Sequence, residues 1–419
     1  MTAGPPPDAP VGLPRRLGLL DAVTIGLGAM LGAGIFVALA SAAQAAGPAL
    51  LLGLALAAII AYCNAVSSAR LAIRYPVSGG TYVYGRERLG EFWGYLAGWG
   101  FIVGKTASCA AIALTVGHYV WPGSPQAMAI AAVIVVTVVN YLGVQKSALA
   151  TRVIVGVVLT VLAAVVVAVF TSGLAEAGRV APGQDASVPG VLQSAALLFF
   201  AFAGYARIAT LGEEVRDPVR VIPRAILIAL SLTTLCYGAV AVAVLAILGP
   251  QRLAASAAPL VAAVTVAGVP VLVPVVALAA VIAAVGSLLA LLLGVSRTVL
   301  AMARDRHLPP ALAAVHPRFG VPHRAELAVG VVVAVLAATL DLRAAIGFSS
   351  FGVLVYYAIA NASAFTLRDT EGRTRRLLPV FGMLGCLTLA FALPVSTILA
   401  GVAVFAVGAA AYVLRRGRR

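Results

Sequence analysis

Long apolar runs recur along the chain from residue 17 to residue 414, separated by short clusters of glycine, proline and charged residues. Most of these runs reach the length of about 20 residues that an α-helix needs to cross the hydrocarbon core of a bilayer. The pattern therefore predicts an all-α membrane protein with about twelve transmembrane helices. The predicted crossings are 17–40, 48–69, 91–120, 125–142, 153–172, 190–212, 222–248, 270–301, 325–340, 344–366, 377–393 and 394–414.

The same pattern predicts how the chain is organised. A single transmembrane domain extends over 15–414, which leaves no room for a separate soluble domain. The segment 1–14 contains five prolines and is predicted to be a disordered cytoplasmic tail. At the other end of the chain, 415–419 is predicted to form a short basic cytoplasmic tail.

Composition supports the membrane assignment. Hydrophobic residues make up 62% of the 419 residues, charged residues make up only 10%, and the mean hydropathy is +1.06. Soluble globular proteins have about a quarter of their residues charged. This chain lacks the polar residues that a water-facing surface needs, so the composition excludes a soluble protein.

The net charge of +15 is explained by topology. If the N-terminus is cytoplasmic, almost all arginines between the crossings face the cytoplasm, and only Arg179, Arg252 and Arg343 face the other side. This bias predicts an even number of crossings in the cell (inner) membrane, with both termini cytoplasmic. Anionic inner-leaflet lipids would attract such a surface, so the charge does not indicate a nucleic-acid partner.

Two crossings contain glycines where a continuous helix is expected. The first reads Gly-Leu-Gly-Ala-Met-Leu-Gly-Ala-Gly-Ile-Phe over 26–36, and the sixth has Gly204 after an aromatic run. Non-helical backbone at membrane depth is tolerated only where it lines a cavity or is buried in protein. Broken helices at matching positions of two halves are typical of secondary transporters. The separation predicts a five-plus-five inverted repeat, 17–172 and 190–366, followed by two extra helices in 377–414.

The directions of the two broken helices predict what they bind. The free N–H groups of Ala33, Gly34 and Ile35 would point into the first break and form a site for a carboxylate. In the sixth crossing the carbonyls near the break would be free to accept from an ammonium; these belong to Phe200, Ala201 and Phe202. Together they predict a site for an α-amino acid. The alternative for Gly28 and Gly32 is close helix packing through a small-xxx-small pattern.

Several motifs resemble those of the amino acid–polyamine–organocation (APC) transporters. The glycine-rich stretch 26–36 resembles their first-crossing signature, and other segments fit their order along almost the whole chain. These segments are Phe199–Pro218 with Ile222-Pro-Arg224, Tyr75–Tyr82, and Ser296–Asp305 with Leu308-Pro309. The resemblance implies a LeuT-like fold in which crossings 1, 2, 6 and 7 rock against the rest.

The resemblance also implies a set of substrate-binding residues. The substrate carboxylate is expected at the first break, and the amino group at the backbone of the sixth crossing. An aromatic side chain closes over the substrate, here Phe200 with Phe202 close by. The residues implied are Met30, Gly32, Ala33, Gly34 and Ile35 in the first crossing, and Phe200, Ala201, Phe202, Ala203 and Gly204 in the sixth.

Two departures from the family pattern bear on the substrate. Ala206 and Gly104 stand where members that carry cationic amino acids tend to have acidic residues, and the neighbouring residues Lys105 and Arg207 are basic. A buried unpaired cation repels a cationic ligand. We therefore expect a neutral amino acid, with cationic amino acids, polyamines or an acidic amino acid as the alternatives.

A third departure concerns ion coupling. Val158 stands where several sodium-independent members hold a lysine in the fifth crossing, so either Na⁺ occupies an equivalent site or another cation replaces it. Lys105 is a candidate for carrying H⁺, because an ionisable group within a crossing is expensive and is usually functional. Its alternatives are snorkelling to a polar cavity or pairing with a carbonyl. Arg207, Glu213 and Glu214 are candidates for an inner gate.

Other functional classes fit the sequence less well. A membrane-embedded enzyme would need intramembrane carboxylates, a metal cluster or a nucleophile with a base, and the acidic residues fall almost entirely in loops and at crossing ends. The histidines have no metal-ligand spacing, so we expect no metal and no cofactor other than a coupling ion. A transport-inactive amino acid sensor would keep both breaks and stays open, as does the oligomeric state.

Overall fold

The computed structural model describes residues 17–75, 79–143, 148–182, 186–209, 214–367 and 374–416. These residues form α-helices joined by short connections, and no β-strand occurs among them. The predicted tail 1–14 and the gate candidate Glu213 lie outside the described residues. Within the described part the prediction of an all-α protein is confirmed.

The first predicted repeat corresponds to seven α-helices. Gly47–Ala49 forms a short 3-10 helix between the second and third of them. The helices are α1 (Leu19–Met30), α2 (Gly34–Ala46), α3 (Leu50–Arg74), α4 (Thr81–Leu89), α5 (Glu91–Val120), α6 (Pro125–Tyr141) and α7 (Ala148–Thr171).

The rest of the described chain adds nine α-helices. Short 3-10 helices at Ala177–Arg179 and Pro310–Ala313 lie in two of its connections. The helices are α8 (Val188–Phe202), α9 (Ala206–Ala209), α10 (Pro218–Ala255), α11 (Pro259–Val266), α12 (Leu272–Arg304), α13 (His323–Thr339), α14 (Leu342–Phe365), α15 (Thr374–Ala390) and α16 (Val395–Arg416).

Each of the twelve predicted crossings coincides with one described helix or with two helices in succession. Seven described helical stretches are long and apolar enough to cross a membrane on their own. Shorter apolar helices supply others, and two of these, α1 and α8, end where the glycine-rich interruptions were predicted. The two broken crossings therefore fall short of the usual length because each is divided between two helices.

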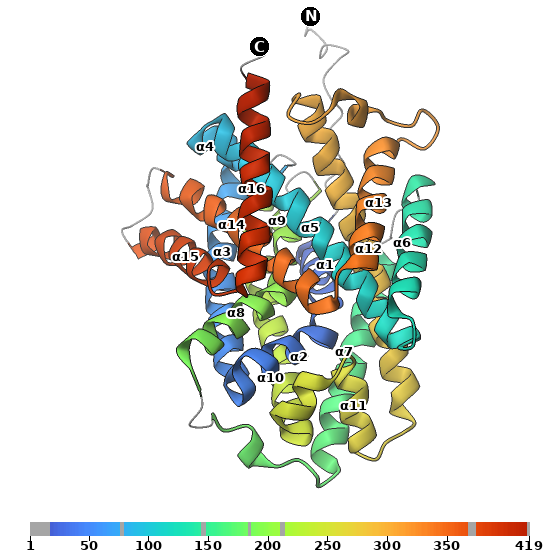
Figure 1. Cartoon of the computed structure of the whole chain (residues 1–419). Helices are drawn as coiled ribbons and strands as arrows, with labels where there is room; N and C mark the ends of the chain where they lie inside the picture. Colours follow the sequence, from blue (N-terminus) through green and yellow to red (C-terminus); the bar gives the residue numbers. More distant parts are fainter. Residues whose placement is uncertain are drawn as a thin grey trace, which may run out of the picture.

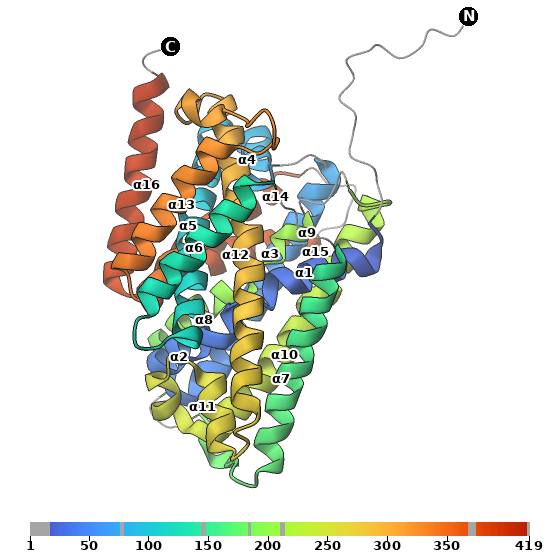
Figure 2. The same cartoon turned by 90° about the vertical axis from the view of Figure 1, so that its right-hand side faces the viewer.

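The long helix α5 forms the centre of the bundle and packs against α12 and α14, as Figures 1 and 2 show. Small residues bring its backbone against α14. A methyl group added at Gly104 would lie 3.0 Å from the backbone nitrogen of Val353, and one added at Gly352 would lie 2.8 Å from the Cα of Gly104. The absence of an acidic side chain at residue 104 thus has a packing reason in this chain.

The two ends of the molecule differ in charge. We call them the α4 end, where α4, the α12–α13 connection and the last turn of α16 lie, and the α11 end, where α11 and the α7–α8 connection lie (Figure 1). The guanidinium of Arg343 contacts residues at the ends of α2 and α10, and that of Arg179 donates to the carbonyl of Ile247. Arg179 and Arg343 therefore lie together at the α11 end, as the charge pattern predicted.

Candidate functional site

The first crossing is broken at its glycines. α1 ends at Met30, α2 begins at Gly34, and Leu31 between them has φ −75° and ψ 35°, which is not helical. In Figure 2 the two halves lie at a clear angle to each other. A helix that begins here has N–H groups in its first turn without intrahelical acceptors, and these groups lie at the break as the sequence predicted.

The sixth crossing is broken in the same way. α8 ends at Phe202, a turn covers Ala203–Tyr205, and α9 begins at Ala206. The last carbonyls of α8 lack regular intrahelical donors because the helix ends at Phe202. Both interruptions therefore expose polar backbone groups inside a hydrophobic bundle.

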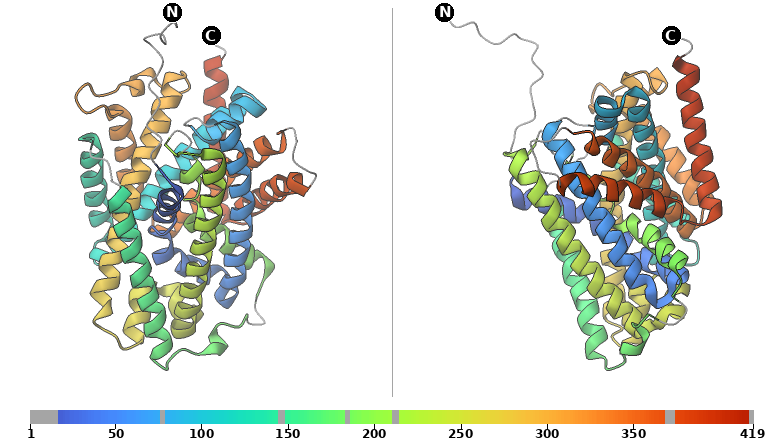
Figure 3. Two further views of the ribbon diagram at one scale, coloured as in Figure 1. Left: turned by 180° about the vertical axis from the view of Figure 1, so that it is seen from behind. Right: turned by 90° about the vertical axis from the view of Figure 1, so that its left-hand side faces the viewer.

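The two breaks lie against each other. A methyl group added at Gly204 would lie 2.3 Å from the carbonyl oxygen of Ala29, and one added at Gly34 would lie 2.7 Å from the Cα of Ala201. Such contacts leave no room for any side chain, so the glycines are required by the close approach of two backbones. The view from behind in Figure 3 places α1 beside the segments that follow α8. The prediction that the breaks meet is borne out by these contacts.

Tyr237 of α10 joins the two breaks. Its hydroxyl lies 2.5 Å from the carbonyl oxygen of Met30 and 3.1 Å from that of Ala201. Its ring packs edge-on against Phe202, with 5.2 Å between ring centroids. Sequence reasoning missed this residue, although a tyrosine hydroxyl within an apolar crossing signals that a polar partner must exist.

Lys105 reaches the break of the sixth crossing. The side chain is 7% exposed, and its Nζ donates a hydrogen bond to the carbonyl oxygen of Ala203 at 3.2 Å. The hydroxyl of Tyr357 donates to the same oxygen at 3.3 Å. Of the alternatives left open by the sequence, pairing with a carbonyl describes the observed contact of Lys105. Tyr357 is a second residue that the sequence did not point to.

The remaining predicted binding residues surround this crossing point. Met30, Ala33, Ile35 and Phe202 are each at most 2% exposed, whereas Phe200 is only partly buried and packs against the core. Substrate-sized space at the breaks would therefore require these side chains or helices to move. We call the set formed by the two breaks, Tyr237, Lys105 and Tyr357 the crossing site.

Comparison with known proteins identifies the group to which this architecture belongs. The family model described as amino acid permease matches residues 21–415, which is almost the whole chain. The chain belongs to the amino acid permease family. This family consists of transporters rather than enzymes, in agreement with the resemblance to the APC transporters seen in the motifs.

Individual relatives differ in what they carry. A transporter of Mycobacterium tuberculosis named as uncharacterized is 71% identical over 411 residues, covering 98% of this permease and 93% of the relative. The branched-chain amino acid permease of Bacillus subtilis is 26% identical, covering 90% of this chain and 88% of its own. The cationic amino acid transporter 7 of Arabidopsis thaliana is 29% identical, covering 86% and 67%. These names include both neutral and cationic substrates.

A serine of α12 adds an oxygen beside the first break of the permease. A methyl group added at Gly32 would lie 2.2 Å from Oγ of Ser287, and this buried Oγ has no hydrogen-bond partner in the structure. Val158, which stands where some family members have a lysine, is fully buried. Ser287 was not among the residues predicted from the sequence, because nothing in the pattern of α12 shows which of its positions faces α1.

Backbone hydrogen bonds and an ion pair connect α1, and the residues just before it, to neighbouring segments. The backbone nitrogen of Leu17 donates to the carbonyl of Glu214 at 3.0 Å, and that of Arg216 donates to the carbonyl of Leu17 at 3.1 Å. Asp21 of α1 forms an ion pair with Arg152 of α7. Glu214 takes part in this connection through its backbone, and Arg207 lies on α9 where the charges of Glu214 and Arg297 act on it. The assignment of these residues to an inner gate stays a prediction.

A second set of polar contacts closes the α4 end of the permease. Tyr82 donates to Oδ2 of Asp305 at 2.5 Å, and Arg86 donates to the same oxygen at 3.0 Å. Burial and the bond to Asp305 raise the pKa of the Tyr82 hydroxyl, which therefore stays protonated as a donor. These contacts connect α4 to the residue that follows α12.

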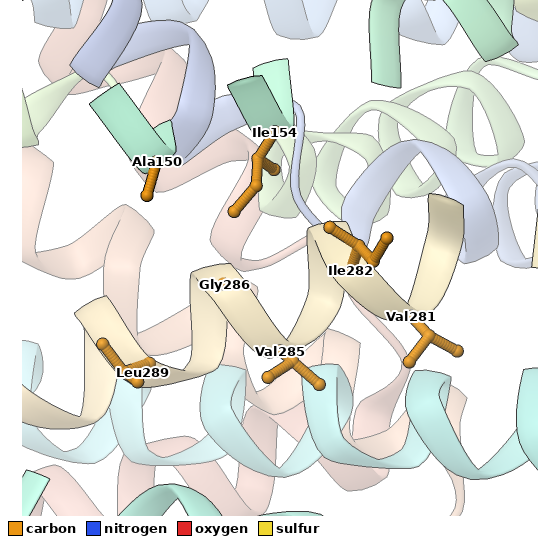
Figure 4. A pocket seen from close by; sticks show the side chains of 7 residues that line it. All are labelled: Ala150, Ile154, Val281, Ile282, Val285, Gly286 and Leu289. Atoms are coloured by element: carbon orange, nitrogen blue, oxygen red, sulfur yellow. The ribbon is translucent and has the colours of Figure 1, made fainter. Parts of the chain in front are cut away.

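An apolar cavity of about 410 Å³ lies between α7 and α12. Figure 4 shows its lining, which comes from α7 and α12. The lining residues are Ala150, Ile154, Val281, Ile282, Val285, Gly286 and Leu289. Since these side chains offer neither charge nor hydrogen-bonding groups, the cavity does not match the chemistry of an amino acid.

Proposed function

We propose that this permease is a secondary active transporter that carries small amino acids across the cell membrane by alternating access. The observation that carries the proposal is the contact between two broken helices at Gly34 and Gly204. Backbone N–H groups at the start of α2 would bind the substrate carboxylate. Carbonyls near the end of α8 would face its amino group, as expected for a midplane transporter site.

The net charge of the substrate follows from the side chains around the crossing site. Lys105 is a cation close to the proposed site, and the described residues place no acidic side chain against it. Cationic amino acids and polyamines are therefore disfavoured. The sequence-based preference for neutral over acidic amino acids stays a prediction.

We propose further that both termini are cytoplasmic and that the α4 end faces the cytoplasm, where its arginines meet anionic lipid. Transport is coupled to H⁺ or Na⁺, or it proceeds by exchange of one substrate for another. The unpartnered oxygen of Ser287 beside Gly32 favours Na⁺, because unwound backbone and neighbouring oxygens are the usual ligands of Na⁺ in broken-helix transporters.

Two measurements on purified protein test the proposal. Thermal-shift screening against the twenty amino acids should show a rise in melting temperature with those that bind the folded state. Uptake of the same amino acids into proteoliposomes should saturate with concentration. Binding without saturable uptake would favour a sensor instead, and uptake that increases linearly with concentration would favour a channel.

A further inference from the structure

Lys105 is a buried cation that, among the described residues, hydrogen-bonds to a neutral carbonyl group. Its Nζ lies 3.2 Å from the carbonyl oxygen of Ala203 and its side chain is 7% exposed. An ammonium has three N–H donors, so two of them have no acceptor in the described structure. Glu326 is the buried carboxylate of the described residues, and it accepts instead from Asn140 at 2.8 Å. Lys105 thus has no anionic partner among the residues described.

Three carbonyl groups at the two breaks are already engaged by side chains. The oxygens of Met30 and Ala201 share the single hydroxyl hydrogen of Tyr237, and that of Ala203 accepts from both Lys105 and Tyr357. A carbonyl oxygen has two lone pairs, so the oxygen of Ala203 is saturated. At the oxygen of Ala203 an incoming ammonium would have to displace one of these donors, and it would also meet the charge of Lys105.

Donors, in contrast, are abundant at the crossing site. The first N–H groups of α2 beside Gly34 lack intrahelical acceptors, and the helix dipole gives this end a partial positive charge. Lys105 adds a full positive charge nearby, because Gly34 touches Ala201, two residues before Ala203. An unpaired buried charge is costly. The crossing site is therefore short of negative charge and of acceptors.

We propose that the substrate of this permease is a small carboxylate of net negative charge, with one carboxylate bound to Lys105. This proposal rests on the crossing site being the transport site. It differs from the sequence-based preference for neutral amino acids, because the sequence does not show that Lys105 lies unpaired at the break beside a carbonyl that already has two donors. Acidic amino acids and dicarboxylates without an amino group share this chemistry.

Three compounds of matched size separate these outcomes. Asparagine is a neutral zwitterion, aspartate adds a negative charge, and succinate has both carboxylates but no amino group. Purified full-length protein in proteoliposomes is assayed for the inhibition constant of each compound near pH 7. We expect aspartate to bind more tightly than asparagine by at least about tenfold. Comparable binding of succinate would show that the amino group contributes little, whereas weaker binding would assign an acidic amino acid.

Substitutions at Lys105 test whether this residue causes the preference. Lys105→Met should remove the preference for aspartate, and Lys105→Arg should retain it. Thr106→Val is the matched control, since Thr106 is the buried neighbour of Lys105 and its hydroxyl bonds only within α5. If Lys105→Met fails to fold, the comparison of aspartate with asparagine in the wild type and in Lys105→Arg still decides the question.

The outcomes are distinguishable from failure of the proposed function. Tighter binding of asparagine than aspartate, or a preference for aspartate that survives in folded Lys105→Met, would overturn the role of Lys105 while leaving amino acid transport intact. Absence of saturable uptake for these three compounds and for all twenty amino acids would instead contradict the proposed transport function itself.

Discussion

Single glycines decide whether the two broken helices can meet. At Gly204 the nearest atoms to an added methyl group belong to the backbone of Ala29 and Met30, which cannot rotate away as a side chain can. Overpacking of this kind typically costs about 1–3 kcal/mol. A substitution there should therefore separate α1 from the turn after α8.

We expect Gly204→Ala to lower the melting temperature and to reduce the initial rate of uptake by at least about tenfold, since about 1.4 kcal/mol corresponds to a factor of ten. Gly238→Ala is the matched control, because a methyl group at Gly238 in α10 would have no neighbour within 4 Å. That variant should transport at the wild-type rate. Wild-type melting and uptake in Gly204→Ala would contradict the close approach of the two breaks.

The sequence predicts some of these residues and not others for a physical reason. Glycine in an apolar crossing is costly to a helix, so clustered glycines at 26–34 and Gly204 are visible without any structure. The roles of Tyr237, Tyr357 and Ser287 depend on which face of a distant helix meets the breaks. Nothing local to those residues contains that information, so the sequence could not show that side chains donate to the carbonyls of Ala201 and Ala203.

Helices rather than individual side chains form the closure around the crossing site. α1 is tied to α7 by the ion pair between Asp21 and Arg152, and the residue preceding α1 is tied through Leu17 to the segment that follows α9. The side chain of Arg152 is 46% exposed, and exposed pairs contribute only about 0–1 kcal/mol to stability. The pair can therefore bias the position of α1 without determining whether the protein folds.

Asp21→Asn should leave the melting temperature almost unchanged and should make the α1 side of the site more accessible. The measurement is the rate of maleimide labelling of a cysteine placed at Ile208, a fully buried residue that faces Gly26. Glu176→Gln is the control, since it breaks the Arg179 ion pair at the α11 end. Equal labelling in all backgrounds would show that the pair between α1 and α7 has no part in closure.

Among the helices, the sequence best predicts those that consist of one long apolar run. A run such as 91–120 is long enough to span and appears as the single helix α5. The short helices α4 and α11 are harder to predict, because neither sequence contains a long apolar run. The sequence also does not predict that Gly104 packs against Gly352, since a single glycine does not indicate which helix it contacts.

The whole molecule separates its charges between two ends, and this separation predicts its orientation. Arg318 lies in the connection between α12 and α13 at the α4 end, whereas Arg252 lies near the end of α10 at the α11 end. The positive-inside bias would place the more basic α4 end in the cytoplasm, as proposed above. The orientation of the broken helices, and hence which half opens to which side, follows from this assignment.

In intact cells, a membrane-impermeant maleimide should label a cysteine at Arg252 and should not label one at Arg318. Permeabilised cells should label both, which controls for the reactivity of the introduced thiols. The four native cysteines are buried or partly buried, and the unsubstituted protein gives their background. Labelling of the Arg318 cysteine alone in intact cells would reverse the orientation.

The shared hydroxyl of Tyr237 constrains how the breaks separate during a transport cycle. A phenol has one hydrogen, so it cannot bond fully to the carbonyls of Met30 and Ala201 at once. If α1 and α8 move apart, the hydroxyl of Tyr237 can keep its hydrogen bond to one of the two carbonyls. Only the weaker, shared bond to the other carbonyl is then lost. Tyr237 would then stabilise the closed arrangement of the two breaks, while the small free-energy cost of losing one shared hydrogen bond would keep their separation reversible.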